Sequence, residues 1–477
     1  MLPKRQTSTG THRGDLNVLK KEDRVIYEMV NKSKAVAIGL DEYHKGQLDV
    51  LRQNDPAIYE LMEKEFARRG ETLQLLAAEN QCSRAVLAAL GSVFQNKTAE
   101  GFAGARCHGG CSVVDELEQL ATERARQAFG AEYANVQPHS GTSANLIILA
   151  AFLEQGDKIL SLGAEQGGHY SHGAKTSIAG RFFNVENFHL DKETYLLDYD
   201  AIKARAIETK PKIIICGFSV YPRTVDFSRF KEIADAAGAY LMADISHISG
   251  LVMARAHPSP MGYADFVTTS TYKCGGPRGG LILMGKGYDR PVKVHGEEKP
   301  MFEHIEKATF PGMQGTPYLN HIAAKAVFLK EAVGQQYQTR QHKIVANAKI
   351  LAESLSGLGV DIVTGGTDNH MVLVNVGSFK DGLTGVVAQK ALEECGLVVD
   401  SHRLAFDKAG AVSGIRLGTP IVTRRGMGVE EMKTISQMIV SVLKAMKIVS
   451  STEYKIDAPF IEQMRGKVRD LCSRFYA

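Results

Sequence analysis

Four short apolar runs in the middle of the chain constrain its fold more than any other feature. They are Lys212–Cys216, Ala239–Ala243, Phe266–Thr271 and Gly280–Met284, and helix-length segments such as Phe227–Ala237 separate several of them. A continuous apolar run of this length is typical of a strand that is buried on both faces. Because strands that alternate with helices form right-handed βαβ units, the sequence predicts an α/β fold with a mostly parallel sheet between helices.

The helical patterns outside this region predict how the chain is divided. An amphipathic pattern begins near Asn54, and a second covers residues 114–129. After about residue 320, a long helical stretch to residue 356 leads to a strand at His370–Val376 and then to a C-terminal helix. A chain of 477 residues is long for one domain. In chain order we predict an N-terminal extension (1–50), a helical arm (51–84), a large cofactor-binding domain (85–325) and a smaller C-terminal α+β domain (326–477).

Composition excludes several classes of function. The chain is 44% hydrophobic and 23% charged with a net charge of +4, so we expect a globular protein without a nucleic-acid partner. We expect no membrane segment, because no apolar stretch reaches spanning length. The seven cysteines contain no CxxC pair, which favours a reducing cytoplasm over a disulfide framework. Cys107, His108 and Cys111 lack a second Cys/His pair at suitable spacing, so we predict no metal site.

Three polar residues follow the predicted strands at their carboxyl ends, where parallel sheets bind ligands. Ser219 follows the first run, Asp244 closes the second, and Lys273 follows the third. A lysine and an aspartate at neighbouring strand ends are the pair that pyridoxal phosphate requires, because the amine attaches covalently and the carboxylate keeps the ring nitrogen protonated. Taken alone, an aspartate and a lysine more often form a buried ion pair, here beside a glycine turn. The glycines after Lys273 are expected to let a ligand approach the backbone.

Other short motifs point to the same chemistry, although each is weak by itself. Ser140, Gly141 and Thr142 precede a helix, where hydroxyls and free amides can bind phosphate or simply cap the helix. His169 follows two glycines and could stack on a flat ring. Arg416, in the segment "SGIRLGTP", could bind an amino-acid carboxylate or lie at the surface.

In their order and joint presence, these motifs resemble the serine hydroxymethyltransferase family of fold-type I pyridoxal-phosphate enzymes. The matching stretches are "LLAAEN" (75–80), "AEGFAGARCHGGCSVVDELEQLA" (99–121), "FGAEYANVQPHSG" (129–141), "GGHYSHG" (167–173), "GFSVYPRTVDF" (217–227), "ADISHISGLV" (243–252), "FPGMQGTP" (310–317), "GGTDNHM" (365–371) and "SGIRLGTP" (413–420). The resemblance covers roughly residues 50–475.

The resemblance implies a role for each matching residue. Lys273 would attach to the cofactor, Asp244 would meet the pyridine nitrogen, and His169 would stack on the ring. Ser219 and His247 would lie near the ring hydroxyl, with His247 also a catalytic residue, and the phosphate would be bound by Ser140, Gly141 and Thr142. Further cofactor-binding residues would be Ser270, Gly315 and Thr316, the last in the family's phosphate segment. Arg416 would bind the substrate carboxylate. A homodimer, with the choice between dimer and tetramer left open, would place Glu100 of one subunit in the other subunit's site as the acid/base carboxylate.

The chain departs from the family pattern around the same pocket. Ala78 stands in place of a serine, Thr98 in place of a tyrosine, and Cys107-His108 in place of a tyrosine pair, which would enlarge the substrate chamber. Ser270 replaces a threonine and Thr316 a glycine. Further departures are Tyr272 for a histidine, a turn after Lys273 that is one residue shorter, and the folate-side residues Ala164, Tyr170, Asp400, Ser401, His402 and Arg403.

Three functions remain open from the sequence. The first is serine/glycine interconversion with tetrahydrofolate, although the altered folate side predicts weak binding of that cofactor. The second is a folate-independent aldolase or transaldolase that acts on a bulkier or α-substituted β-hydroxy amino acid. The third is a non-catalytic family member that acts as a partner protein, and the joint retention of Lys273, Asp244, Glu100 and Arg416 argues against it.

Overall fold

The computed structural model describes residues 40–475, which form two compact units, the first ending at Gly70 and the second beginning at Glu71. The first unit consists of α2 (Leu40–His44), α3 (Gln47–Asn54) and α4 (Pro56–Glu71). Neither α3 nor α4 buries a residue. The apolar face that the sequence predicts on α4 is therefore exposed, with 68% of Phe66 accessible to solvent.

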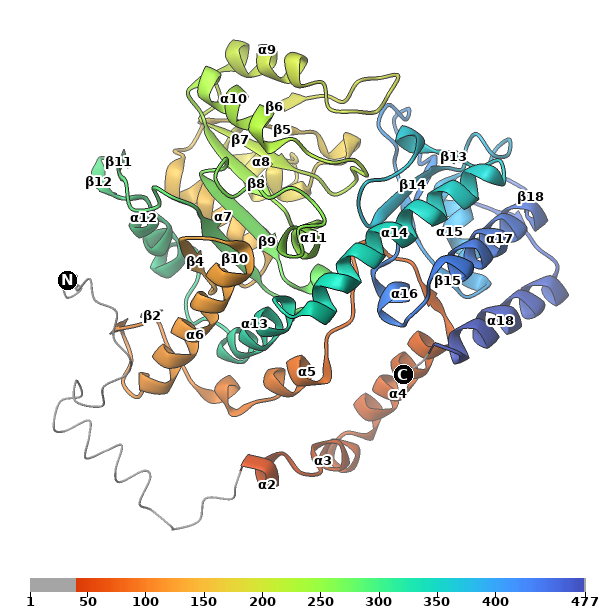
Figure 1. Ribbon diagram of the computed structural model, residues 1–477, viewed down its shortest axis with the longest axis horizontal. Coiled ribbons are helices and arrows are strands. Elements are labelled where there is room, and N and C mark those ends of the chain that lie inside the picture. Colours follow the sequence, from red (N-terminus) through yellow and green to blue (C-terminus); the bar gives the residue numbers. More distant parts are fainter. Residues whose placement is uncertain (1–39, 476–477) are drawn as a thin grey trace. The chain divides into compact units, whose positions relative to one another are not determined.

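The second unit is built around a seven-stranded sheet, shown in Figure 1. Its strands, in spatial order, are β4 (Tyr133–Asn135), β10 (Gly280–Met284), β9 (Phe266–Ser270), β8 (Tyr240–Asp244), β7 (Ile213–Gly217), β5 (Lys158–Leu162) and β6 (Asn184–Phe188). Strands β6, β5, β7, β8 and β9 are parallel, whereas β10 runs antiparallel to both of its neighbours. The prediction of a mostly parallel sheet is confirmed.

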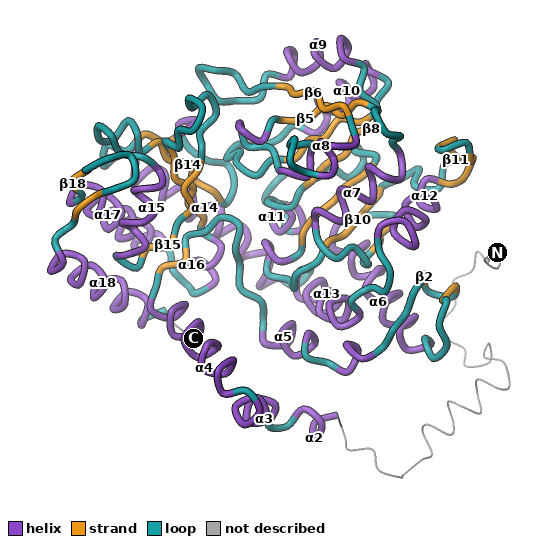
Figure 2. The backbone as a smooth tube through the Cα atoms, turned by 180° about the vertical axis from the view of Figure 1, so that it is seen from behind, coloured by secondary structure: helices purple, strands orange, loops and turns teal. Residues whose placement is uncertain are grey.

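Helices cover both faces of this sheet because its strands are apolar on both sides. In β7, Ile213 and Ile215 pack into one core, and Ile214 and Cys216 into another. The first core also contains residues of α7 (Gly141–Phe152), α8 (Ile178–Phe182) and α12 (Met301–Lys307), and Figure 2 shows α7 on this face. The second core contains residues of α6 (Ser112–Phe129), α9 (Tyr199–Thr209), α10 (Phe227–Ala237), α11 (Ser249–Met253) and α13 (Leu319–Ala332). The shorter α5 (Arg84–Leu90) also contributes to this second core.

A four-stranded antiparallel sheet with its own core forms the C-terminal part of this unit. Its strands, in spatial order, are β13 (Asp361–Ile362), β14 (Met371–Asn375), β17 (Gly414–Gly418) and β16 (Asp400–His402). Its core includes residues of α14 (Gln335–Gly357), α15 (Gly385–Glu394), α16 (Pro420–Arg424), α17 (Val429–Ala445) and α18 (Ala458–Ser473). Nearby, β1 (Leu73–Gln74) pairs in parallel with β15 (Leu397–Val398).

The helical stretch that the sequence predicts over residues 318–356 is two helices, α13 and α14. Gly334 is the N-cap of α14 and has an extended backbone (φ −76°, ψ 146°), so the helical hydrogen bonds are interrupted there. Within residues 40–475, none of the helices has the length and apolar character needed to cross a bilayer. In the same part of the chain, no three His, Cys, Asp or Glu side chains are grouped as metal ligands would be.

Candidate active site

A cavity of about 210 Å³ lies where the carboxyl ends of β8 and β9 meet the first turn of α7. Of the residues predicted from the sequence, Ser140, Gly141, Thr142, His169, Asp244, Ser270 and Lys273 line this cavity. His139, Ser246, Tyr272, Arg278 and Gly279 complete its walls. The fold thus brings together residues that are up to 140 positions apart in the chain (His139 to Gly279).

Lys273 enters the cavity from a short 3-10 helix, η5 (Tyr272–Cys274), which follows β9 directly. Its Nζ donates a hydrogen bond to Ser270 Oγ at 3.1 Å and lies 4.5 Å from the centroid of the Tyr272 ring. The backbone of Lys273 is also fixed, because its carbonyl accepts a hydrogen bond from Asn80 Nδ2 at 3.2 Å. Within residues 40–475, Nζ forms no ion pair with a carboxylate, so no acidic partner has to be displaced there.

Two of the glycines after Lys273 pack closely against a helix. A Cβ on Gly276 would lie 2.7 Å from the Phe328 ring, and a Cβ on Gly279 would lie 2.2 Å from Lys325 Cε. Both neighbours belong to α13. Close packing against this helix leaves no room for a side chain at either position, a reason that the sequence did not predict.

Asp244, at the end of β8, is a buried carboxylate that hydrogen bonds keep ionised. Its Oδ2 accepts from His172 Nε2 at 2.9 Å and from Asn145 Nδ2 at 2.7 Å. Its Oδ1 accepts from the backbone N–H of Ser246 at 3.0 Å and from the Ser246 hydroxyl at 2.6 Å. Burial acts to raise the pKa of Asp244, but the hydrogen bond and charge of His172 outweigh burial and hold the pKa well below its usual range.

The start of α7 forms a site for an anion. Ser140 is the N-cap, and its Oγ accepts from the backbone N–H of Ser143 at 3.0 Å. The first N–H groups of a helix have no acceptor within the helix, and the helix dipole favours negative charge there. Gly141 packs tightly at the cavity wall, because a Cβ at this position would lie 3.1 Å from Ser270 Cβ. A phosphate group fits these donors.

Histidines surround the cavity, and burial keeps several of them neutral. His169 Nδ1 lies 2.8 Å from Ser171 Oγ, and burial lowers the pKa of His169 to about 4. His247 does not line the main cavity but lines a small neighbouring one of about 20 Å³, together with Asp244. Its ring stacks on that of His370, with centroids 5.8 Å apart and an angle of 17°, and burial lowers the pKa of His247 well below its usual range.

Arg416 on β17 is buried and lies outside the 210 Å³ cavity. Its Nη1 donates to the carbonyl oxygen of Ser219 at 2.6 Å, and its Nη2 donates to Asp400 Oδ2 at 2.7 Å. Its Nε is buried and has no hydrogen-bond partner within the described part of the chain. Ser219 and Ala78 do not line the cavity either. Ala78 is half-buried, and the carbonyl of the preceding residue, Ala77, accepts a hydrogen bond from His370 Nε2 at 3.1 Å.

A further group of predicted residues lies away from this cavity. Glu100 precedes the hairpin of β2 (Gly101–Phe102) and β3 (Ala105–Arg106), and the following loop, which carries His108, is exposed. Glu100 Oε1 lies 3.2 Å from the position that a Cβ on Gly315 would take. Glu100, His108, Gly315 and Thr316 are all absent from the lining of the cavity that holds Lys273 of the same chain.

Sequence reasoning missed His172, Asn145 and Ser246, the three side chains that donate hydrogen bonds to Asp244. A signal was present for His172, since it lies three residues after His169 in "GGHYSHG". Nothing local marks Asn145, because one polar residue in the first turns of an apolar helix is common. Only its contact with a strand 99 residues away reveals its role.

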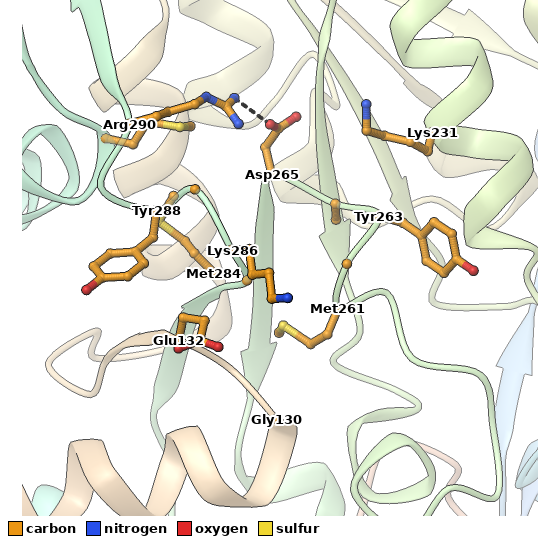
Figure 3. A pocket seen from close by; sticks show the side chains of 15 residues that line it. Gly130, Glu132, Lys231, Met261, Tyr263, Asp265, Met284, Lys286, Tyr288 and Arg290 are labelled. Atoms are coloured by element: carbon orange, nitrogen blue, oxygen red, sulfur yellow. Dashed lines mark hydrogen bonds and ion pairs between the residues drawn. The ribbon is translucent and has the colours of Figure 1, made fainter.

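A larger cleft of about 450 Å³ lies at the opposite ends of the strands, beside the start of β9 and the end of β10, and is drawn in Figure 3. Two of its basic side chains form ion pairs: Arg290 Nη2 donates to Asp265 Oδ1 at 2.7 Å, and Lys231 pairs with Asp235, which lies outside the cleft. None of the residues that the sequence predicts for the site lines this cleft. We therefore assign the active site to the smaller cavity.

The side chains around the smaller cavity fit the cofactor that the sequence predicts. The cavity is lined by the Lys273 amine, the ionised Asp244 carboxylate and the N-terminus of α7. These groups match, in that order, the aldehyde, the ring nitrogen and the phosphate of pyridoxal phosphate. A comparison with protein families agrees: the model described as serine hydroxymethyltransferase matches residues 51–439. The chain belongs to the serine hydroxymethyltransferase family, and it is a pyridoxal-phosphate-dependent transferase of fold type I.

Proposed function

We propose that this enzyme makes and breaks the Cα–Cβ bond of serine, with glycine as the other amino acid and tetrahydrofolate as the one-carbon acceptor. The observation that carries the proposal is the shared cavity of Lys273, Asp244 and the α7 N-terminus. Bound pyridoxal phosphate would supply an electron-accepting ring for the electron pair left on Cα. The rest of the chemistry falls to side chains of this chain.

Each of these side chains has a defined task in the proposal. Lys273 Nζ would hold the cofactor in the resting enzyme and, as a free amine after the substrate has bound, would exchange a proton at Cα. Asp244 keeps a positive charge on the ring nitrogen, and His172 and Asn145 fix the orientation of its carboxylate. His169 is neutral at pH 7, since burial lowers its pKa to about 4, so it can stack on the ring without adding charge.

Arg416 is proposed to bind the carboxylate of the amino acid. Its unpartnered Nε and the second proton of Nη2 form one edge of the guanidinium, which suits a bidentate carboxylate. The Ser219 carbonyl and Asp400 would hold the other edge and thereby orient the group.

The enzyme is proposed to work as a homodimer, in which each subunit completes the other subunit's site. This follows from the position of Glu100, His108, Gly315 and Thr316, which do not line the cavity of their own chain. Mixing the inactive variants Lys273→Ala and Glu100→Gln tests the idea. Random reassociation should restore about a quarter of wild-type activity, because half of the dimers gain one complete site. No recovery would mean that each subunit supplies its own carboxylate.

A second candidate is a folate-independent aldolase for larger β-hydroxy amino acids. It is favoured by Cys107 and His108, both exposed, which stand where the family has two tyrosines. The test is glycine production from serine, allo-threonine and α-methylserine, each with and without tetrahydrofolate, with Lys273→Ala as the blank. Serine cleavage that tetrahydrofolate stimulates supports the first function, whereas faster cleavage of the larger substrates without folate supports the second.

We also propose that the protein works in a reducing compartment such as the cytoplasm. All seven cysteines are free, and none is joined in a disulfide.

A further inference from the structure

Helix α13 buries a lysine that the proposed chemistry does not use. Lys325 is 2% exposed, and no carboxylate within residues 40–475 forms an ion pair with it. Its Nζ instead donates to three backbone carbonyl oxygens, those of Val136 at 2.7 Å, Pro138 at 3.0 Å and Gly280 at 2.9 Å. A buried ammonium is costly even when its hydrogen bonds are satisfied, so its presence calls for an explanation.

The three carbonyls belong to the backbone that shapes the phosphate end of the cavity. Val136 and Pro138 lie in the segment that leads to Ser140 and the start of α7, and Gly280 begins β10. The two segments are also joined directly, because Gly280 N–H donates to the Pro138 carbonyl at 2.9 Å. The ammonium of Lys325 therefore ties the approach to α7 to the sheet and to α13.

Lys325 also lies directly behind a wall of the cavity. Gly279 lines the cavity, and a Cβ on Gly279 would lie 2.2 Å from Lys325 Cε and 2.8 Å from Nζ. The space that a side chain at position 279 would fill is therefore occupied by the lysine. The backbone of Gly279 therefore lies between the Lys325 ammonium and the cavity.

We propose that Lys325 is a positioning residue for the cofactor phosphate: it fixes the backbone around the α7 N-terminus and places a positive charge behind the anion. The inference concerns cofactor binding alone and does not depend on which amino acid the enzyme uses. A fixed charge in a dry interior interacts with an anion more strongly than a solvated surface lysine does.

The same arrangement links phosphate binding to protonation. Burial lowers the pKa of Lys325 to about 7, so the amine loses its proton in the weakly alkaline range unless an anion lies nearby. A dianionic phosphate favours the ammonium, and binding above pH 7 should therefore draw in up to about one proton. Charged or titratable groups on the surrounding elements include Glu118, whose charge favours the ammonium, and Arg124 on α6, Arg106 on β3, His139 before α7 and Arg278 before β10.

The test compares two ligands that differ only in the phosphate. Pyridoxal phosphate and pyridoxal are titrated into the apoenzyme of the wild type, of Lys325→Met and of the matched control Lys330→Met, whose side chain lies exposed on the same helix. We expect Lys325→Met to weaken pyridoxal phosphate by about ten- to a hundredfold and pyridoxal by less than about threefold, and the control to change neither. Equal losses for both ligands, or no loss for either, would overturn the proposal.

A measurement on the wild type keeps the test decisive if Lys325→Met does not fold. Calorimetric titrations at pH 8 in buffers of different ionisation enthalpy report the protons taken up with each ligand. Pyridoxal phosphate should take up more protons than pyridoxal, by up to about one. If equal numbers of protons were taken up with the two ligands, the phosphate would not control the protonation of Lys325, and the proposal would be wrong.

Discussion

Replacement of Asp244 by Asn removes the one buried carboxylate that faces the cavity, while the side chain keeps its size. The carboxylate accepts four hydrogen bonds, from His172, Asn145 and twice from Ser246. An amide has one oxygen, so its NH₂ group must face two of these donors. At least one buried donor then loses its acceptor, which costs about 1–3 kcal/mol in the free energy of unfolding.

The effect on catalysis should be larger than the effect on stability. An amide cannot hold a positive charge on the ring nitrogen, and loss of one preorganised electrostatic contact typically lowers kcat by about 10²- to 10³-fold. We expect this loss in kcat for glycine formation from serine, with pyridoxal phosphate kept saturating. Urea unfolding of the apoenzyme measures the stability change separately.

The pH dependence supplies a further check on the ionised state of Asp244. Since the pKa of this group is lowered on folding from its ordinary value of 3.8, its contribution to stability is present above that value and is lost as pH falls through the folded pKa. The difference in unfolding free energy between the wild type and Asp244→Asn should therefore shrink as the pH falls below about 4.

Asp265→Asn is the matched control. Asp265 accepts hydrogen bonds from the Leu241 backbone N–H at 2.9 Å and from Arg290. It directly precedes β9 and therefore lies at the end of the strands opposite to Asp244. It should lower stability while kcat stays near the wild-type value. If Asp244→Asn retained more than about a tenth of the wild-type kcat, the assignment of Asp244 to the ring nitrogen would be wrong.

Three other substitutions test separate parts of the structure. His108→Tyr should shift the ratio of kcat/KM toward serine over α-methylserine, and an unchanged ratio would refute a role for this loop in the substrate chamber. Arg416→Lys should raise KM for the amino acid by about ten- to a hundredfold because the two-pronged donor edge is lost; an unaltered KM in steady-state assays would place the carboxylate elsewhere. Gly276→Ala should lower the free energy of unfolding by about 1–3 kcal/mol, since its Cβ would lie 2.7 Å from the Phe328 ring. The control Gly109→Ala, with open space around it, should unfold in urea as the wild type does, and equal stability of the two variants would contradict the packing argument.

The sequence alone predicted the sheet and much of the cavity, because those signals are local. Apolar runs mark β7, β8, β9 and β10. The polar residues that follow them place Asp244 and Lys273 together at the carboxyl ends of β8 and β9. The N-cap at Ser140 is equally local, since a hydroxyl followed by a small residue favours a helix start. These features need only the order of residues along the chain and the rules for parallel strands.

The reason for the glycine turn and the part played by Lys325 could not be read in this way. Lys325 lies among apolar neighbours in "IAAKAVFL", which marks it as unusual but does not say what it contacts. Its acceptors Val136 and Gly280 lie 189 and 45 residues away in the chain. The same lysine leaves no room for a side chain at Gly279, a contact that the sequence does not reveal.

The order of residues thus determined β7, β8, β9 and β10, the mostly parallel character of the sheet, and the two groups proposed to meet the cofactor. Packing between distant segments decided which side chains hold Asp244, why positions 276 and 279 have no side chain, and which predicted residues stay away from the chain's own cavity. The physical reason is that backbone preferences and burial patterns act over a few residues. Contacts such as Asn145 with Asp244, by contrast, exist only once the helix and the strand have packed together.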